Sequence, residues 1–155
     1  FGLVGGMTVP LGNLSQQSTT GWHAGALINL GVPLVPLGAR IEATWYQMGT
    51  KSFGDGNSAK ARIIAGTFDV TYTLATVPIV KPYLIGGVGA YNVKFDDTRF
   101  TTIGSNSQTR FGINAGAGLR VQLTGFSTFV EARWHDIFLT GQSRQMLPIS
   151  VGISF

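Results

Sequence analysis

The chain has 155 residues, of which 44% are hydrophobic and 12% are charged, with 22 glycines, no cysteine and a formal net charge of +4. A single domain is expected over residues 1–155, and the charged share, about half of the usual roughly 25%, excludes a surface covered by lysine and glutamate. The composition also excludes disulfides and thiolate chemistry, and no apolar run approaches the roughly 18 residues of a membrane-spanning helix.

Apolar residues alternate with small or polar residues along most of the chain, which is typical of β-strands with two different faces. In the second predicted strand, for example, Trp22, Ala26 and Ile28 alternate with Gly25 and Asn29. The pattern predicts eight strands, in residues 1–12, 22–34, 37–48, 60–74, 79–95, 111–121, 129–135 and 147–155.

Segment 79–95 shows the weakest alternation of the eight, because apolar residues and glycines follow one another through its centre. An apolar face is still expected on this strand. We assign to it Tyr83, Ile85, Tyr91, Val93 and Phe95.

The connections between the strands alternate in length. Polar loops are predicted at 13–20, 49–58, 96–108 and 140–145, and short turns near 35–36, 75–78 and 124–127. This alternation is typical of an up-and-down meander with one elaborated end. An even number of strands places both chain ends at the short-turn end.

The composition of the two faces decides between two kinds of closed barrel. A lipocalin-like barrel buries its large apolar residues inside, whereas a membrane barrel turns them outward to lipid. Here the second face consists mainly of Gly, Ser, Thr and Asn, which suits the narrow interior of eight strands better than a solvated surface. The sequence therefore predicts an all-β fold, an eight-stranded antiparallel up-and-down β-barrel of the transmembrane type.

Aromatic residues fall near the predicted strand ends, as in the interfacial girdles of membrane barrels. Those near the short turns are Phe1, Tyr72, Tyr83 and Phe155, and those near the long loops are Trp22, Tyr91, Phe95, Phe111 and Phe138.

Four segments are the most distinctive of the chain: 81–91 (KPYLIGGVGAY), 111–120 (FGINAGAGLR), 129–133 (FVEAR) and 147–155 (LPISVGISF). Through these segments the whole chain resembles the small eight-stranded outer membrane β-barrels of the OmpA/OmpX and opacity-protein type, a porin-like family. The resemblance implies a bacterial outer membrane protein exposed at the cell surface, with its short turns in the periplasm. It also implies that the last strand, ending in Phe155, is the signal for the barrel insertion machinery. Function does not follow from such a fold.

Six charged residues fall on the inward face: Arg40, Glu42, Asp69, Arg120, Glu131 and Arg133. Three guanidiniums and three carboxylates can form a satisfied network that plugs the lumen, and the alternative role is an ion path or gate. Removal of the three arginines is expected to admit small ions.

Two cations, Lys60 and Arg62, fall on the lipid-facing register near the outer rim. They suggest contact with lipopolysaccharide phosphates, and the alternative is interfacial anchoring by long side chains. Outer membrane lipids and the insertion machinery are the expected partners, and self-association is possible. Nucleic acid is excluded, because no basic stripe interleaves with exposed aromatic residues.

No catalytic, cofactor or metal site is predicted. His23 and His135 lie on separate strands without further clustered ligands, and no serine is found at a strand spacing that matches His135. We therefore expect a non-enzymatic protein with a structural, surface-interaction or adhesion role through its long loops. The alternatives are an outer membrane enzyme acting on lipid A or acyl chains, and a self-assembling extracellular barrel subunit.

Overall fold

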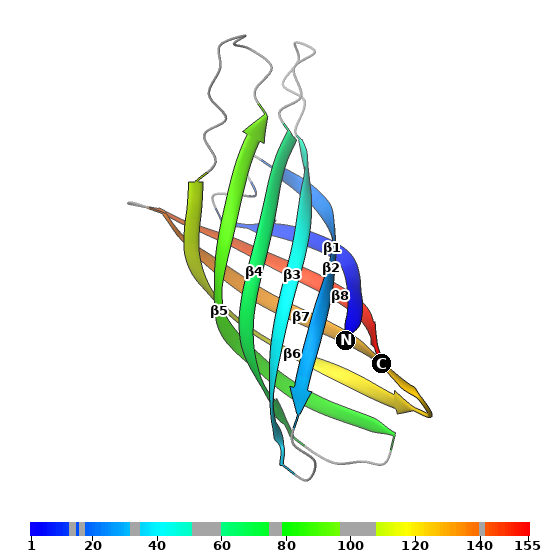
Figure 1. Ribbon diagram of the computed structural model, residues 1–155. Helices are drawn as coiled ribbons and strands as arrows, with labels where there is room; N and C mark the ends of the chain where they lie inside the picture. The colour runs from blue at the N-terminus through cyan, green and yellow to red at the C-terminus, as the bar shows by residue number, and fades with distance from the viewer. Residues whose placement is uncertain are drawn as a thin grey trace.

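The computed structural model is a closed barrel of eight antiparallel strands (Figure 1). It describes residues 1–12, 15, 18–31, 35–50, 60–74, 79–96, 108–139 and 142–155. The strands are β1 (Gly2–Leu11), β2 (Ser18–Gly31), β3 (Leu37–Thr50), β4 (Lys60–Thr73), β5 (Val80–Asp96), β6 (Gln108–Leu123), β7 (Phe126–Leu139) and β8 (Gln142–Ser154). None of the described residues belongs to a helix long and apolar enough to cross a membrane.

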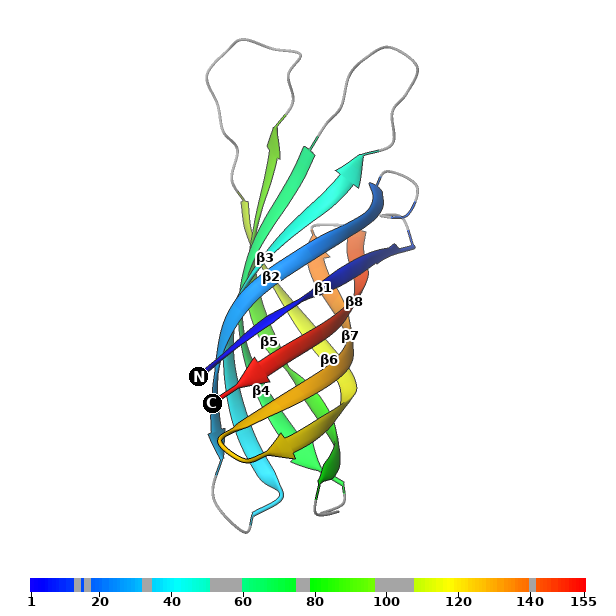
Figure 2. The same ribbon diagram turned by 90° about the vertical axis from the view of Figure 1, so that its right-hand side faces the viewer.

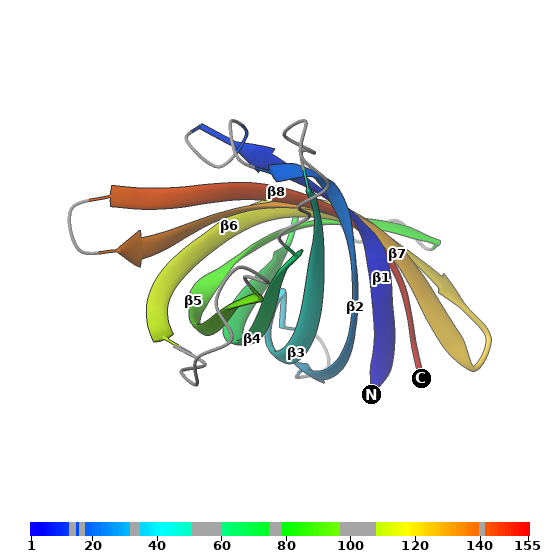
Figure 3. The same cartoon turned by 90° about the horizontal axis from the view of Figure 1, so that it is seen from above.

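Every strand pairs with the next in the chain, and β1 also pairs with β8, so that no sheet edge is left open. The strands are strongly tilted (Figure 2), and the view from above shows them surrounding one lumen (Figure 3). The two termini lie side by side, where the backbone nitrogen of Phe155 donates to the carbonyl oxygen of Phe1 at 2.9 Å.

β3, β4 and β5 extend farthest at one end of the barrel (Figure 2), the end at which residues 51–59 and 97–107 connect the strands. We call this the long-loop end and the opposite end the short-turn end. In β7 and β8 the predicted boundaries were too short: β7 runs to Leu139 and β8 begins at Gln142, so most of the predicted loop at 140–145 is strand. The polar residues Gln142, Ser143 and Arg144 suggested a loop, but cross-strand pairing with β7 overrides this local preference.

The large apolar residues point outward, as the alternation predicts for a membrane barrel. Phe1 and Phe111 are 77% and 73% exposed, and β3 and β4 present Ile41, Trp45 and Phe68 on the same outer face. The inner face carries the six charged residues that were predicted to point inward, together with many hydroxyl and amide side chains. The predicted fold class is confirmed.

The face assigned to β5 was wrong. Tyr83, Ile85, Tyr91 and Val93 all point into the lumen and are at most 7% exposed, while Leu84 and Val88 face outward. Tyr83 and Tyr91 therefore belong to no outer aromatic girdle, and the side chain of Phe95 lies outside the described residues. The error arose because apolar side chains fill parts of this lumen, so polarity does not separate the two faces of β5.

Glycines on neighbouring strands make room for the inward aromatic rings. A Cβ atom built on Gly118 would lie 2.6 Å from the ring of Tyr83, and one on Gly152 would lie 2.2 Å from the ring of Phe129. Both distances are too short for real contacts, so these rings lie against bare backbone. The glycine-rich runs thus serve the packing of a narrow barrel interior.

Candidate functional site

The inward charges meet in one buried network, and Arg133 of β7 is its centre. Its Nε donates to Glu131 at 2.7 Å, its Nη1 to Asp69 at 3.0 Å and its Nη2 to Glu42 at 2.7 Å. One guanidinium thus contacts all three carboxylates, which come from β7, β4 and β3. Charge-assisted bonds of this kind are about twice as strong as neutral ones.

Arg40 of β3 adds a second cation to the network. Its Nη1 lies 2.8 Å from Glu131 and 3.8 Å from Glu42, and its Nε donates to the side-chain oxygen of Asn29 at 3.0 Å. The remaining nitrogen, Nη2, has no hydrogen-bond partner among the described residues, but the guanidinium carbon lies 4.8 Å from the ring centroid of Phe129. A cation held against an aromatic face compensates part of its lost hydration.

Neutral donors complete the shell of the carboxylates. Glu42 accepts from the Thr44 hydroxyl at 2.8 Å and Glu131 from the Tyr83 hydroxyl at 2.6 Å. Asp69 accepts from the Asn114 amide at 2.7 Å and from the Thr67 hydroxyl at 2.8 Å. Thr44 and Asn114 thereby bind the two oxygens that the guanidiniums leave open, Glu42 Oε1 and Asp69 Oδ1, as buried polar groups require.

Arg120 lies beside this network. Its guanidinium carbon is 5.2 Å from the ring centroid of Tyr83, whose hydroxyl binds Glu131. The structure therefore brings five of the six predicted residues into direct contact and links the sixth through an aromatic ring. With Arg120 included, three positive and three negative charges give the lumen group a net charge of zero.

The two histidines lie in the lumen on the long-loop side of the charges. His23 is within 2.9 Å of the Ser150 hydroxyl through Nε2 and of the Thr8 hydroxyl through Nδ1. His135 Nδ1 is 2.7 Å from the Tyr91 hydroxyl. Sequence spacing did not reveal the contact of His23 with Ser150, because the two residues belong to β2 and β8, on either side of β1.

Two buried apolar clusters flank the network. The cluster toward the long-loop end joins β3, β4, β5, β7 and β8 and consists of Tyr46, Met48, Ile63, Ala65, Tyr91, Val93, Ile137 and Met146. The cluster toward the short-turn end joins β1, β2, β5 and β7 and consists of Val4, Leu27, Tyr83, Ile85 and Phe129. Because both connect strands on opposite sides of the barrel, described side chains from opposite walls meet in the lumen at three levels.

The remaining predicted residues lie outside this network. Arg62 is exposed on β4 and pairs in register with Gln47 and Lys94, whereas the side chain of Lys60 lies outside the described residues. Phe155 is 65% exposed, and its ring centroid is 6.0 Å from that of Phe1. Within the described ranges, no three His, Cys, Asp or Glu side chains gather in a way that could hold a metal ion.

Comparison with solved structures finds the same fold in bacterial outer membrane proteins. The chain is similar to the neisserial surface protein NspA, with a TM-score of 0.69 and 16% identity over 98% of this chain and 92% of that one. Its fold is that of the small outer membrane β-barrels. The predicted resemblance and outer membrane location agree with this finding.

Two further structures show how broad this fold group is. The outer membrane enzyme PagL matches with a TM-score of 0.61 and 16% identity, over 99% of this chain and 97% of that one. Ail, the attachment invasion locus protein of Yersinia pestis, matches with a TM-score of 0.56 and 15% identity over the same shares. No family model and no curated protein sequence matches the chain. The fold is thus shared by surface proteins and an enzyme.

Proposed function

We propose that this chain is a non-enzymatic outer membrane barrel that acts through the surface at its long-loop end. The observation that carries the proposal is the filled lumen, in which a neutral charged layer lies between two apolar clusters. We infer that a lumen closed in this way passes no solute, so that transport is not the proposed role. The external surface is then the place where partners bind.

The charge of that surface favours an anionic partner. The lumen group is neutral, so the formal charge of +4 comes from the other eight cations and four anions. From the sequence we assign seven of these cations and the four anions to the long-loop end: Lys51, Lys60, Arg62, Lys94, Arg99, Arg110 and Arg144 against Asp55, Asp96, Asp97 and Asp136. Of these, Lys51, Asp55, Asp97 and Arg99 lie outside the described residues. Ail, which shares the fold, has been crystallised with the heparin analogue sucrose octasulfate. Phosphates or sulfates of surface polysaccharides are therefore the partners that we propose.

Binding of the folded protein to immobilised heparin, used as a polyanion probe, tests this role. The double change Lys51→Gln and Arg99→Gln in the long connections should weaken binding severalfold at low salt, and high salt should abolish the difference. Lys81→Gln at the short-turn end is the matched control and should leave binding unchanged. Equal effects of the two variants, or binding insensitive to salt, would contradict the proposal.

An enzymatic role is the second candidate, because His23 and Ser150 form a close pair and PagL shares the fold. Three observations disfavour it. Both side chains are buried, at 3% and 4% exposed, so that a substrate has no access to the Ser150 hydroxyl. The other ring nitrogen of His23 contacts the Thr8 hydroxyl rather than a carboxylate that would orient a catalytic base. The pair also faces the lumen rather than the lipid.

Changing Ser150 to Ala tests the enzymatic alternative. We expect the variant to fold and to bind heparin as the wild type does, and neither protein to release fatty acid from purified lipopolysaccharide in detergent. His23→Ala and His135→Ala together should likewise leave heparin binding intact. Fatty-acid release by the wild type that disappears in a folded Ser150→Ala variant would establish the enzyme and refute our proposal.

A further inference from the structure

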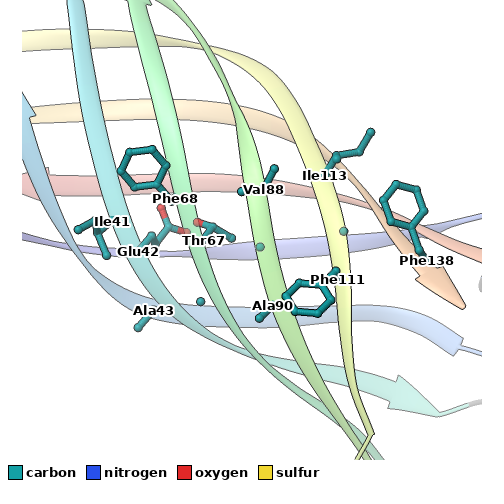
Figure 4. Close-up of a pocket in the computed structure, with 13 residues that line it drawn as sticks. Ile41, Glu42, Ala43, Thr67, Phe68, Val88, Ala90, Phe111, Ile113 and Phe138 are labelled. Carbon is teal, nitrogen blue, oxygen red and sulfur yellow. The ribbon is translucent and has the colours of Figure 1, made fainter.

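A groove of about 600 Å³ crosses the outer face of the barrel from β3 to β7. Its wall is almost entirely carbon. Phe111 and Phe138 stand at one end and Ile41 and Phe68 at the other, with the small side chain of Ala90 between them (Figure 4). The groove faces away from the lumen and belongs to the apolar belt.

The strand register explains why the surface is hollow here. Ala43, Gly66 and Ala90 pair across β3, β4 and β5, so three small residues form one row on the outer face. The next row toward the short-turn end holds Ile41, Phe68 and Val88, and the next row toward the long-loop end begins with Trp45 and Ile64. The small residues of the first row leave a trough beside the bulky row of Ile41, Phe68 and Val88, and the groove follows these two rows across the strands.

The outer face turns polar on the long-loop side of the groove. Asn92 and Thr109, which pair across β5 and β6 one row above Ala90, are joined by a hydrogen bond of 3.2 Å. One row farther, exposed Arg62 pairs in register with Lys94. Four residues separate Gly66 from Arg62, so the rise along β4 between trough and cation is about 13 Å.

We propose that this groove binds one acyl chain of an anionic lipid, with the lipid phosphate at the level of Arg62. The proposal rests on the outer membrane location proposed above. From the groove toward the long-loop end, the outer face is first apolar, then hydrogen-bonding and then cationic. A phospholipid or glycolipid has the matching order of acyl chain, hydrogen-bonding groups and phosphate. The groove would hold the acyl chain of the same lipid whose phosphate is predicted to contact Arg62.

A second copy of the barrel is a poorer occupant. Contact between two copies through this face would bring the charged Arg62 of each copy toward an apolar interface, and removing a charged group from water is costly. An acyl chain fills a narrow trough and leaves the rim in the headgroup region. We therefore commit to the lipid.

The groove can be filled from the protein side without disturbing the barrel. A Cβ atom on Gly66 would meet no heavy atom within 4 Å, so Gly66→Leu places its side chain in the open trough. Ala90→Leu fills the neighbouring position of the same row. Ala117→Leu provides a matched control, because Ala117 is an exposed alanine on β6 outside the groove.

Native mass spectrometry of the detergent-solubilised barrel measures how much lipid the proposed site retains. The barrel is first incubated with phosphatidylglycerol or with phosphatidylcholine of the same acyl chains. The wild type should retain one phosphatidylglycerol. Gly66→Leu with Ala90→Leu should reduce retention of both lipids at least about tenfold, since the leucines occupy the place of several methylene groups. Ala117→Leu should behave as the wild type does, and Arg62→Gln should lower only the preference for phosphatidylglycerol.

Unchanged retention in the folded double variant overturns the proposal. A wild-type dimer that the double variant abolishes would assign the groove to a second copy instead. A gel-mobility shift between unheated and boiled samples reports folding of each variant, and Ala43→Leu replaces any variant that lacks the shift. A wild type that is monomeric and soluble without detergent would refute the membrane location, an outcome distinct from loss of lipid retention.

Discussion

Replacement of Arg133 by Met should destabilise the barrel by about 3–5 kcal/mol, the usual cost of breaking a buried ion pair by removing one partner. Among the described residues, the guanidinium of Arg133 is the one group that contacts Glu42, Asp69 and Glu131 together. Methionine fills much of the same volume but leaves Asp69 with neutral donors alone. Arg40 still contacts Glu42 and Glu131, which limits the loss.

Urea unfolding of the barrel reconstituted in lipid vesicles, followed by tryptophan fluorescence and gel mobility, measures this loss. Lys81→Met is the control: Lys81 donates to Gln122 in an exposed contact, and exposed polar or ionic contacts of this kind contribute about 0–1 kcal/mol. If Arg133→Met and Lys81→Met had the same unfolding free energy, the network would contribute nothing to the fold. Arg133→Lys should recover part of the loss, because one ammonium replaces one of the three contacts.

The eight strands and the inward position of the six charges could be predicted from the sequence, because lipid-facing strands tolerate few charges and alternate strictly. The outward side of β4, for instance, reads Ile64, Phe68 and Val70 against inward Thr67 and Asp69. Because side chains alternate between the two faces, this contrast assigns a face to all remaining residues of the strand.

Other features depend on contacts that a single strand does not encode. The face of β5 is one of them, since Tyr83 lies opposite Gly118 on β6 and the ring of Tyr91 lies beside Gly112 of the same strand. The contact between His23 and Ser150 is another, because it follows from the pairing of β1 with both β2 and β8. The lipid-facing groove likewise arises from the alignment of small residues on adjacent strands.

The structure also changes what is expected of a variant without the lumen arginines. The charged layer is one of the three levels at which side chains close the lumen. The apolar clusters around Tyr46 and Phe129 remain when the three lumen arginines, Arg40, Arg120 and Arg133, are replaced by Ser. That variant, once shown to fold, should still carry no steady current in planar bilayers. Adding Tyr46→Ala and Phe129→Ala should admit small ions. Conductance in the triple variant alone would show that the apolar clusters are not barriers.

The central claim of a closed lumen is tested most directly by the conductance of the wild-type barrel in planar lipid bilayers. The account predicts insertion without a steady ionic current, because a neutral charged layer and two apolar clusters close the lumen at three levels. Insertion would be verified independently by protease protection of the reconstituted barrel. A large, steady conductance of the inserted wild type would contradict the account and would make the charged layer part of an ion path.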